Sequence, residues 1–120
     1  MRKIYLFFLL CLTLFSTKGL AADFYWTGKG PNKNNNTLAN WALNSVNGTI
    51  PTVAPGANDN VFFTDGATLF NVDFVTANIV YNNFTSNSST NNYIFKLAVI
   101  AGLIKTLTIS GVMNLSDKAS

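Results

Sequence analysis

Apolar and polar residues alternate along much of the chain, in short runs that polar clusters separate. The runs are rich in β-branched and aromatic residues, and the clusters in Asn, Gly, Asp and Ser, which is typical of strands joined by turns. After residue 22, no segment has the 3.6-residue periodicity of an amphipathic helix. The pattern therefore predicts an all-β protein. Its expected strands are 24–26, 60–63, 68–74, 77–84, 93–99 and 106–115.

Three stretches have a more specific interpretation. In "KTLTISGVMNL" (105–115), alternate side chains from Leu107 to Leu115 are expected to share one face of a strand. "LAVIAGLIKTL" (97–107) fits a short buried helix as well as a strand, because periodicity cannot decide for an apolar run of this length. "TDGA" (64–67) is the one strong candidate for a hairpin link, joining 61–63 to 69–72.

Tight two-residue turns between matched strands are otherwise nearly absent, which favours a parallel β-helix over a meander of hairpins. The first coil of such a solenoid must be covered. Trp26 and Trp41 are then expected to form the apolar plates of an N-terminal cap, and the Asn-rich stretch between them a solvated loop. The alternative is a small β-sandwich in which both indoles are ordinary core residues.

The first 21 residues have the layout of a secretory signal peptide. Arg2 and Lys3 precede the apolar run "IYLFFLLCLTLF", and small residues follow it. The run is shorter than the roughly 20 residues that span a bilayer, so we expect membrane contact only during export. Cleavage after Ala21 puts Gly19 and Ala21 at the small-residue positions, and cleavage after Ala22 is nearly as good. The predicted location is secreted or on the outer cell surface.

The net charge of +3 comes entirely from the leader, through Arg2, Lys3 and Lys18. The rest of the chain has as many Lys as Asp, so we expect no nucleic-acid partner. It also has no Cys, His, Glu or Arg, which removes disulfides and the usual catalytic groups. Asp59, Asp65 and Asp73 could in principle supply a glycosidase pair, but turn residues are the better interpretation. We therefore predict a protein that is not an enzyme and has no cofactor.

Two binding chemistries are still open. Calcium prefers hard oxygen donors, but the spacing of the candidates matches neither an EF-hand nor a calcium-binding repeat, so this prediction is weak. Its candidates are Asn58, Asp59, Asn60 and Asp65. Aromatic rings flanked by Asn amides could instead stack on sugars, unless they are cap and core residues shielded from solvent. The candidates for such a platform are Tyr25, Trp26, Trp41, Tyr81 and Tyr93.

The order of motifs resembles the start of autotransporter-type passenger domains and related secreted β-helix adhesins. "FYWTGKG", then "NW", then "TIPTVAPGANDNVFF" carry the resemblance, through Trp26, Gly28, Asn40, Trp41, Pro55, Gly56, Asp59, Val61 and Phe63. "KTLTISGVMNLS" is similar to a strand that recurs in such passengers, through Leu107, Thr108, Ile109 and Gly111. The resemblance implies a right-handed parallel β-helix that works in surface display or adhesion. It also implies partners on a host or neighbouring-cell surface, including glycans.

This resemblance suggests three regions: a signal peptide (1–21), a cap with its Asn-rich loop (22–60), and solenoid coils (61–120). Passenger domains normally continue for many coils, so this chain is a fragment, a truncated reading frame or a small relative that works alone. We expect a fragment with incomplete coils. The open coil near 106–115 should then expose apolar side chains and an unpaired strand edge.

Overall fold

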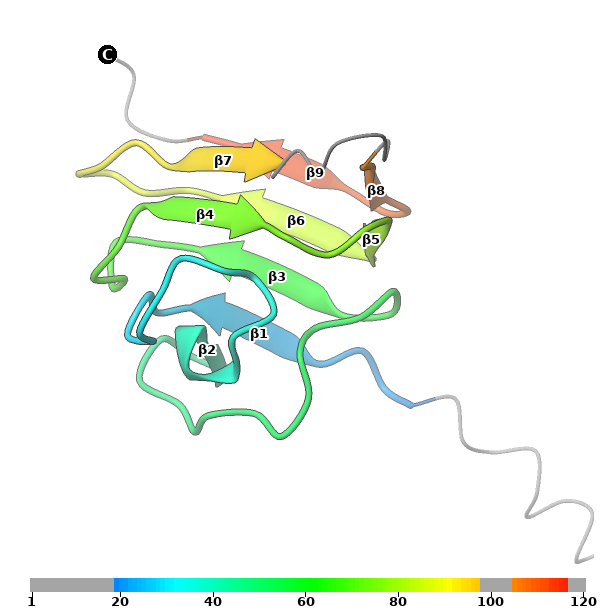
Figure 1. Ribbon diagram of the computed structural model, residues 1–120, viewed down its shortest axis with the longest axis horizontal. Coiled ribbons are helices and arrows are strands. Elements are labelled where there is room, and N and C mark those ends of the chain that lie inside the picture. Colours follow the sequence, from blue (N-terminus) through cyan, green and yellow to red (C-terminus); the bar gives the residue numbers. More distant parts are fainter. Residues whose placement is uncertain (1–18, 98–104, 117–120) are drawn as a thin grey trace, which may run out of the picture.

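The computed structural model describes residues 19–97 and 105–116, and this part of the chain is all-β, as predicted (Figure 1). Its one helical element is a short 3₁₀ turn, η1, at Leu38–Asn40. The strands are β1 (Asp23–Trp26), β2 (Trp41–Leu43), β3 (Asn60–Phe63), β4 (Asn71–Phe74), β5 (Ile79–Tyr81), β6 (Asn83–Ser86), β7 (Ile94–Leu97), β8 (Leu107–Ile109) and β9 (Met113–Leu115).

The strands form three sheets. The largest has the order β2-β1-β3-β6-β9, and two-stranded sheets are formed by β4 with β7 and by β5 with β8. The β1–β2 pair is antiparallel, and the other pairs of named strands are parallel. Figure 1 shows β4 and β7 stacked in one layer in front of β3 and β6.

From β3 onward, each strand pairs with the strand three elements further along the chain: β3 with β6, β4 with β7, β5 with β8, and β6 with β9. Asn60 and Asn83, which face each other in the β3–β6 register, are 23 residues apart. Asn71 and Ile94, which face each other in the β4–β7 register, have the same separation, whereas Ile79 and Leu107 in the β5–β8 register are 28 residues apart, because the connection from β7 to β8 is longer. The chain therefore passes the three sheets in a fixed order and returns to the first.

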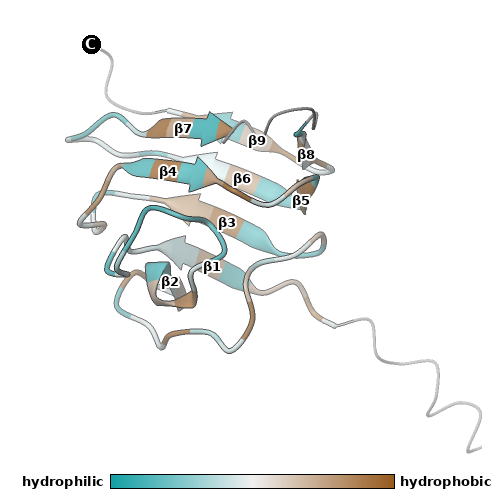
Figure 2. Ribbon diagram, viewed as in Figure 1, coloured by the Kyte–Doolittle hydropathy of each residue, from teal (hydrophilic) through white to brown (hydrophobic). Residues whose placement is uncertain are grey.

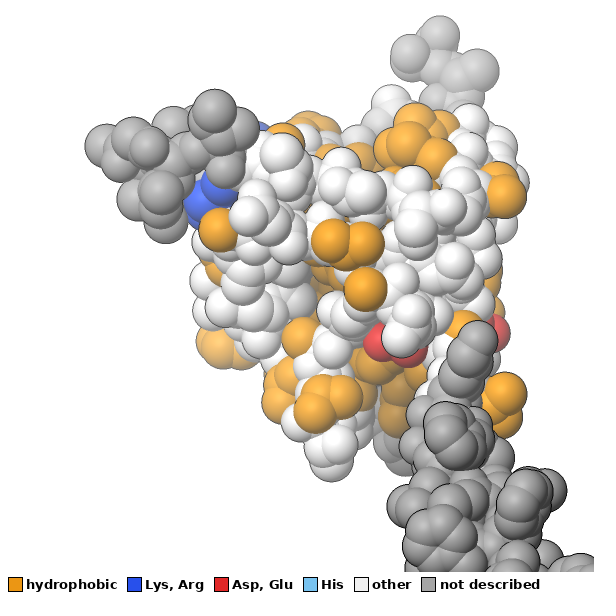
Figure 3. Space-filling view, turned by 90° about the vertical axis from the view of Figure 1, so that its right-hand side faces the viewer, with side chains coloured by type: hydrophobic (Ala, Val, Ile, Leu, Met, Phe, Trp, Pro, Cys, Tyr) orange, Lys and Arg blue, Asp and Glu red, His pale blue; other side chains and the backbone are white. Residues whose placement is uncertain are grey.

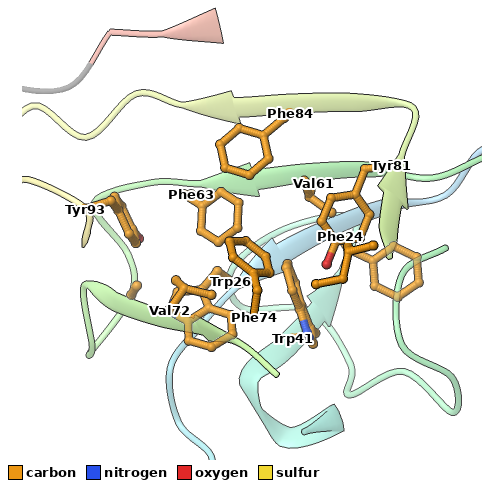
Figure 4. Close-up of a cluster of buried hydrophobic side chains, with 12 residues drawn as sticks. Phe24, Trp26, Trp41, Val61, Phe63, Val72, Phe74, Tyr81, Phe84 and Tyr93 are labelled. Carbon is orange, nitrogen blue, oxygen red and sulfur yellow. The ribbon is translucent and has the colours of Figure 1, made fainter. Parts of the chain in front are cut away.

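Side chains alternate between the interior and the surface along β1, β3, β4 and β6, since neighbouring residues of a strand point to opposite faces. Figure 2 shows the same alternation of hydrophobic and hydrophilic residues along β4. The inward side chains meet in one aromatic-rich core (Figure 4). Phe63 lies at its centre, with ring centroids 4.9 to 6.2 Å from those of Trp26, Trp41, Phe84, Tyr93 and Phe95.

Strand existence was predicted better than strand boundaries. The expected strand at 77–84 is divided at Asn82 into parts of β5 and β6, and the one at 106–115 is divided into β8 and β9. At these corners the backbone bonds to a segment distant in the sequence: the Asn82 amide donates to the Asp59 carbonyl, and the Gly111 amide to the Asn82 carbonyl. A Cβ on Gly111 would lie 2.7 Å from that Asn82 oxygen, which explains the glycine.

Two further expectations need correction. The 64–67 hairpin is wrong, because β3 pairs with β1 and β6 whereas β4 pairs with β7. The face expected to run from Leu107 to Leu115 is shared by two strands of two sheets, β8 and β9. β2 was not predicted. Most of the ambiguous apolar run at 97–107 lies outside the described residues.

Candidate functional site

The two tryptophans lie together at the N-terminal end of the core. Their ring centroids are 5.2 Å apart at an interplanar angle of 83°, and both side chains are fully buried. Each indole N–H has an acceptor: Trp26 donates to the Leu69 carbonyl at 2.9 Å and Trp41 to the Asn35 carbonyl at 2.7 Å. The indoles therefore join β1 and β2 to two separate loops, an arrangement that both a cap and an ordinary core allow.

Burial also removes most of the predicted sugar platform. Trp26 and Trp41 are fully buried, and Tyr81 and Tyr93 are 1% and 8% exposed, so their ring faces are not open to a ligand. Only Tyr25 is partly exposed. The sequence identified these five residues as candidates because they are aromatic. Strand alternation and the pairing of distant strands determine which of them face inward.

The Asn-rich loop is more ordered than a solvated loop, because Asn40 organises it. The Asn40 side chain is fully buried and accepts a hydrogen bond from the Gly30 amide at 2.8 Å. It donates to the carbonyls of Asn32 and Asn34 at 2.9 and 3.0 Å. The buried Asn40 amide thus satisfies three backbone groups of the loop, which in a regular helix or sheet would bond to other backbone groups.

Asn35 connects the same loop to the next coil. Its side-chain oxygen accepts from the Val75 amide at 3.0 Å, and its nitrogen donates to the Tyr81 hydroxyl at 3.5 Å. Burial raises the pKa of Tyr81 to about 12, and the hydrogen bond from Asn35 opposes this shift. Tyr81 is therefore a neutral, structural hydroxyl at physiological pH.

Tyr25 has a neighbour on the outer face of the largest sheet that sequence reasoning missed. The rings of Tyr25 and Phe62, which are in register on β1 and β3, stack with centroids 4.7 Å apart and an interplanar angle of 13°. Both residues are partly exposed. The outward row continues through Thr85 and Asn114, which follow Phe62 in the register. The alternation in β3 could have identified Phe62 from the sequence, because it points this side chain to the face opposite to that of Val61 and Phe63.

A row of polar side chains runs beside these rings. The Asn60 side chain donates to the Asp23 carboxylate at 2.8 Å and accepts from the amide nitrogen of Asn83 at 2.9 Å. The oxygen of Asn83 in turn accepts from the Val112 amide at 2.8 Å. This polar ladder crosses β1, β3, β6 and the residue before β9, so it ties successive coils together at the same corner.

The calcium candidates do not converge on one site. Asp59 and Asn60 lie at the start of β3 and Asp65 beyond its end, so at about 3.3 Å per residue they are separated by roughly 15–20 Å. Asp59 already accepts hydrogen bonds from the backbone amides of Ala22 and Gly56, at 3.0 and 2.8 Å. The described residues contain no group of three or more acidic side chains placed to hold a metal ion.

Asp65 instead fastens one coil to the next. Its carboxylate accepts from the hydroxyls of Ser88, Ser89 and Thr90 and from the backbone amides of Ser89 and Thr90. These hydrogen bonds, that of the Ser88 hydroxyl first, hold the pKa of Asp65 far below its usual range. The motif "TDG" thus belongs to a clamp between two loops rather than to a hairpin.

The described part of the chain lines at least two surface pockets. One of about 350 Å³ lies between residues 54–57, the β5 region and the side of Asn35. The other, of about 310 Å³, lies between Lys29 and residues 46–48 and contains the exposed Ile50. Neither lining includes a carboxylate. Figure 3 shows that one face of the molecule carries few charged side chains.

The last strands leave apolar side chains in solvent. Met113 and Leu115 follow Phe84 and Ser86 in the register, where the earlier coils bury their side chains, yet they are 52% and 60% exposed. Leu97, at the end of β7, is 43% exposed. Among the named strands, β7, β8 and β9 each pair on one side only. This open end agrees with the expectation from the sequence.

The chain matches no family model, no curated protein and no solved structure. Within residues 19–97 and 105–116, no helix has the length and apolarity needed to cross a bilayer.

Proposed function

We propose that this chain forms the N-terminal cap and first coils of a right-handed parallel β-helix, which acts outside the cell as a non-enzymatic, adhesin-like surface protein. The order of the parallel pairs is the observation that supports this most. β3, β4 and β5 are followed by β6, β7 and β8, each paired with the strand three elements earlier. A β-sandwich is built mainly from antiparallel pairs, and among the named strands only β1 and β2 pair in that way.

The proposed mechanism is structural. Stacked coils extend the molecule in one dimension, so that loops are presented at a distance from the surface that carries them. Contacts with a host or neighbouring cell would be made by the uncharged polar side chains of those loops. The right-handed sense follows the strong preference of parallel crossover connections.

The fold is tested by nuclear Overhauser effects between backbone protons of paired strands. The β-helix predicts parallel contacts for Val61 with Phe84, for Val72 with Phe95 and for Val80 with Thr108, all in one molecule. Antiparallel contacts between consecutive strands would show a sandwich instead.

The location is tested by blotting cell-surface, culture and cytoplasmic fractions with an antibody against residues 24–97. We expect the signal outside the cytoplasm, in a form that lacks the leader. A band much larger than this chain indicates a long passenger, and a band of similar size indicates a small secreted domain. Retention in the cytoplasm contradicts the proposed function.

A glycan-binding module is the second candidate, because Tyr25 and Phe62 form a partly exposed aromatic pair beside a row of amide side chains. Their mutual stacking uses one face of each ring, which leaves less surface for a sugar. Electrophoresis of the full chain through gels containing polysaccharide tests this function. Binding predicts retardation that Tyr25→Ala abolishes, whereas the control Ile50→Ala, at an exposed apolar residue in the pocket beside Lys29, retains it.

A further inference from the structure

The folded body begins at Ala22. Gly19, Leu20 and Ala21 are exposed, and Leu20 is 96% exposed. Among the residues from 19 onward that the structure describes, Ala22 is the first that is partly buried, and it packs against the aromatic core. Figure 1 shows the chain leaving the largest sheet at this point as an extended segment without neighbours. A protease can therefore reach the bonds before Ala22, because cleavage requires an exposed and extended backbone.

The backbone of Ala22 is held on both sides. Its nitrogen lies 3.0 Å from Oδ1 of Asp59, and its carbonyl accepts from the Asn60 amide at 2.9 Å. The second oxygen of Asp59 accepts from the Gly56 amide at 2.8 Å, which fixes the orientation of the carboxylate. A carboxylate is thus already aimed at the atom that becomes an amino group if the preceding peptide bond is cut.

We propose that the bond between Ala21 and Ala22 is a proteolytic processing site, and that the ammonium group released at Ala22 pairs with the carboxylate of Asp59. This inference rests on the proposed export of the chain. The reaction is hydrolysis: water adds across the peptide bond, Ala21 keeps the new carboxylate, and Ala22 keeps the nitrogen, which takes up a proton. The enzyme required is a leader peptidase that cuts after small residues, as Gly19 and Ala21 allow.

The structure favours this bond over the next one. Cleavage after Ala22 would remove the side chain that packs on the core and the nitrogen that contacts Asp59. It would also take away the carbonyl that the Asn60 amide uses. Cleavage after Ala21 keeps all three contacts and adds a charge to one of them.

The added charge strengthens an existing hydrogen bond. The contact in the precursor joins a neutral amide to a carboxylate, whereas in the product both partners are ionised, so the attraction between two opposite charges is added to the hydrogen bond. A nearby carboxylate favours the protonated amine, so the pKa of the Ala22 amino group should rise above its usual value of about 7.7–8.0. Asp23, the next residue, adds a second carboxylate of the same sign. Processing would thereby fix the start of β1 against the β3 corner.

The processing site is tested by expressing the full chain in a secretion-competent bacterium and determining the mass and N-terminal sequence of the product. A product that starts at Ala22 is the expected result. An exported product that starts at Asp23 or elsewhere overturns the processing site but leaves the proposed export intact. An unprocessed chain that stays in the cytoplasm contradicts both.

The pairing is tested on the exported product by the rate of acylation of its α-amino group at pH 7, relative to the peptide Ala-Asp-Phe-Tyr. Each unit of pKa increase lowers the reactive fraction about tenfold, so we expect labelling at least about threefold slower than for the peptide. Asp59→Asn should restore the faster rate, and the control Asp73→Asn should remain slow. Equal rates for the wild-type protein and the peptide overturn the pairing, whether or not Asp59→Asn folds.

Discussion

The indoles of Trp26 and Trp41 meet edge to face, with centroids 5.2 Å apart, and together they cover the first turn of the core. Trp26 lies on β1 and Trp41 on β2, which are the only antiparallel pair among the named strands. The antiparallel return of β2 places one further aromatic layer on the outer edge of β1. The two indoles therefore belong to the largest sheet, and in the proposed β-helix they would form its N-terminal cap.

Loss of the Trp41 side chain should lower the stability of the fold. We expect Trp41→Ala to reduce the free energy of unfolding by about 3–5 kcal/mol, because it leaves a cavity against Trp26, Phe24 and Phe63. Denaturant unfolding followed by circular dichroism measures the loss. Tyr25→Ala, on the outer face of the same sheet, is the control and should cost clearly less. Equal losses for the two variants would contradict a special role of Trp41.

Gly28 should not tolerate a side chain. Its φ is +64°, and a Cβ there would lie 2.7 Å from the Cβ of Leu69 and 2.8 Å from its backbone nitrogen. We expect Gly28→Ala to lower the free energy of unfolding by about 1–3 kcal/mol, because both the backbone and the neighbouring loop are strained. Gly56→Ala is the matched control, since its Cβ would meet only Asp59, at 3.7 Å. A comparable loss at Gly56 would argue against this explanation.

The clamp at Asp65 should make stability depend on pH in the acid range. The pKa of Asp65 is lowered in the folded state, so its contribution is present above the unfolded pKa of about 3.9. It is lost as the pH falls below that value towards the folded pKa, because the carboxyl group then takes up a proton in the unfolded chain but not in the folded one. We expect Asp65→Asn to be less stable than the wild type at pH 7, with the difference shrinking below pH 4. Thermal melts at pH 7, 4 and 2.5 measure this.

Asp73→Asn is the control for the clamp, because it removes one carboxylate whose side chain does not take part in it. We expect it to leave the acid part of the stability profile close to that of the wild type. If Asp65→Asn differed equally from the wild type at pH 7 and pH 2.5, the contribution of the clamp would not depend on ionisation.

The open end should promote self-association of the full chain. Met113 and Leu115 are more than half exposed and lie on a strand with one free edge. We expect the chain without its leader to aggregate when expressed alone, and Met113→Ser with Leu115→Ser to reduce light scattering. Val53→Ser, at a residue that is 66% exposed in a loop, is the control and should have little effect. A sharp, reversible melt of the unmodified monomer would contradict the prediction.

Strand alternation could be predicted from the sequence because it is a local property. The run "NVFF" gave β3 with its observed bounds, and "DFYW" gave most of β1. The corners were missed for a physical reason. Asn82 and Gly111 interrupt strands because their backbone groups bond to the adjacent coil, and no local pattern encodes that distant partner.

The residues of the candidate site could likewise be predicted only in part from the sequence. Residue type identified Tyr25 as an aromatic that could face solvent, but its partner Phe62 is 37 positions away and becomes a neighbour only through the β1–β3 register. Asp59 and Asp65 are close in sequence and were grouped as oxygen donors. The extended strand β3 separates them, and each carboxylate accepts hydrogen bonds from a different segment of the chain.

The sequence by itself determined the all-β class and the inward set of large side chains, because a period of two along a strand depends only on neighbouring residues. It also contained the signals of a leader and of an uncharged polar surface. The tertiary structure alone decided which strands pair, where the coils bend and what each polar side chain holds. Many of those relations join residues 22 to 46 positions apart, such as Asn35 with Tyr81 and Asn82 with Asn60, and only the pairing of distant strands brings them together.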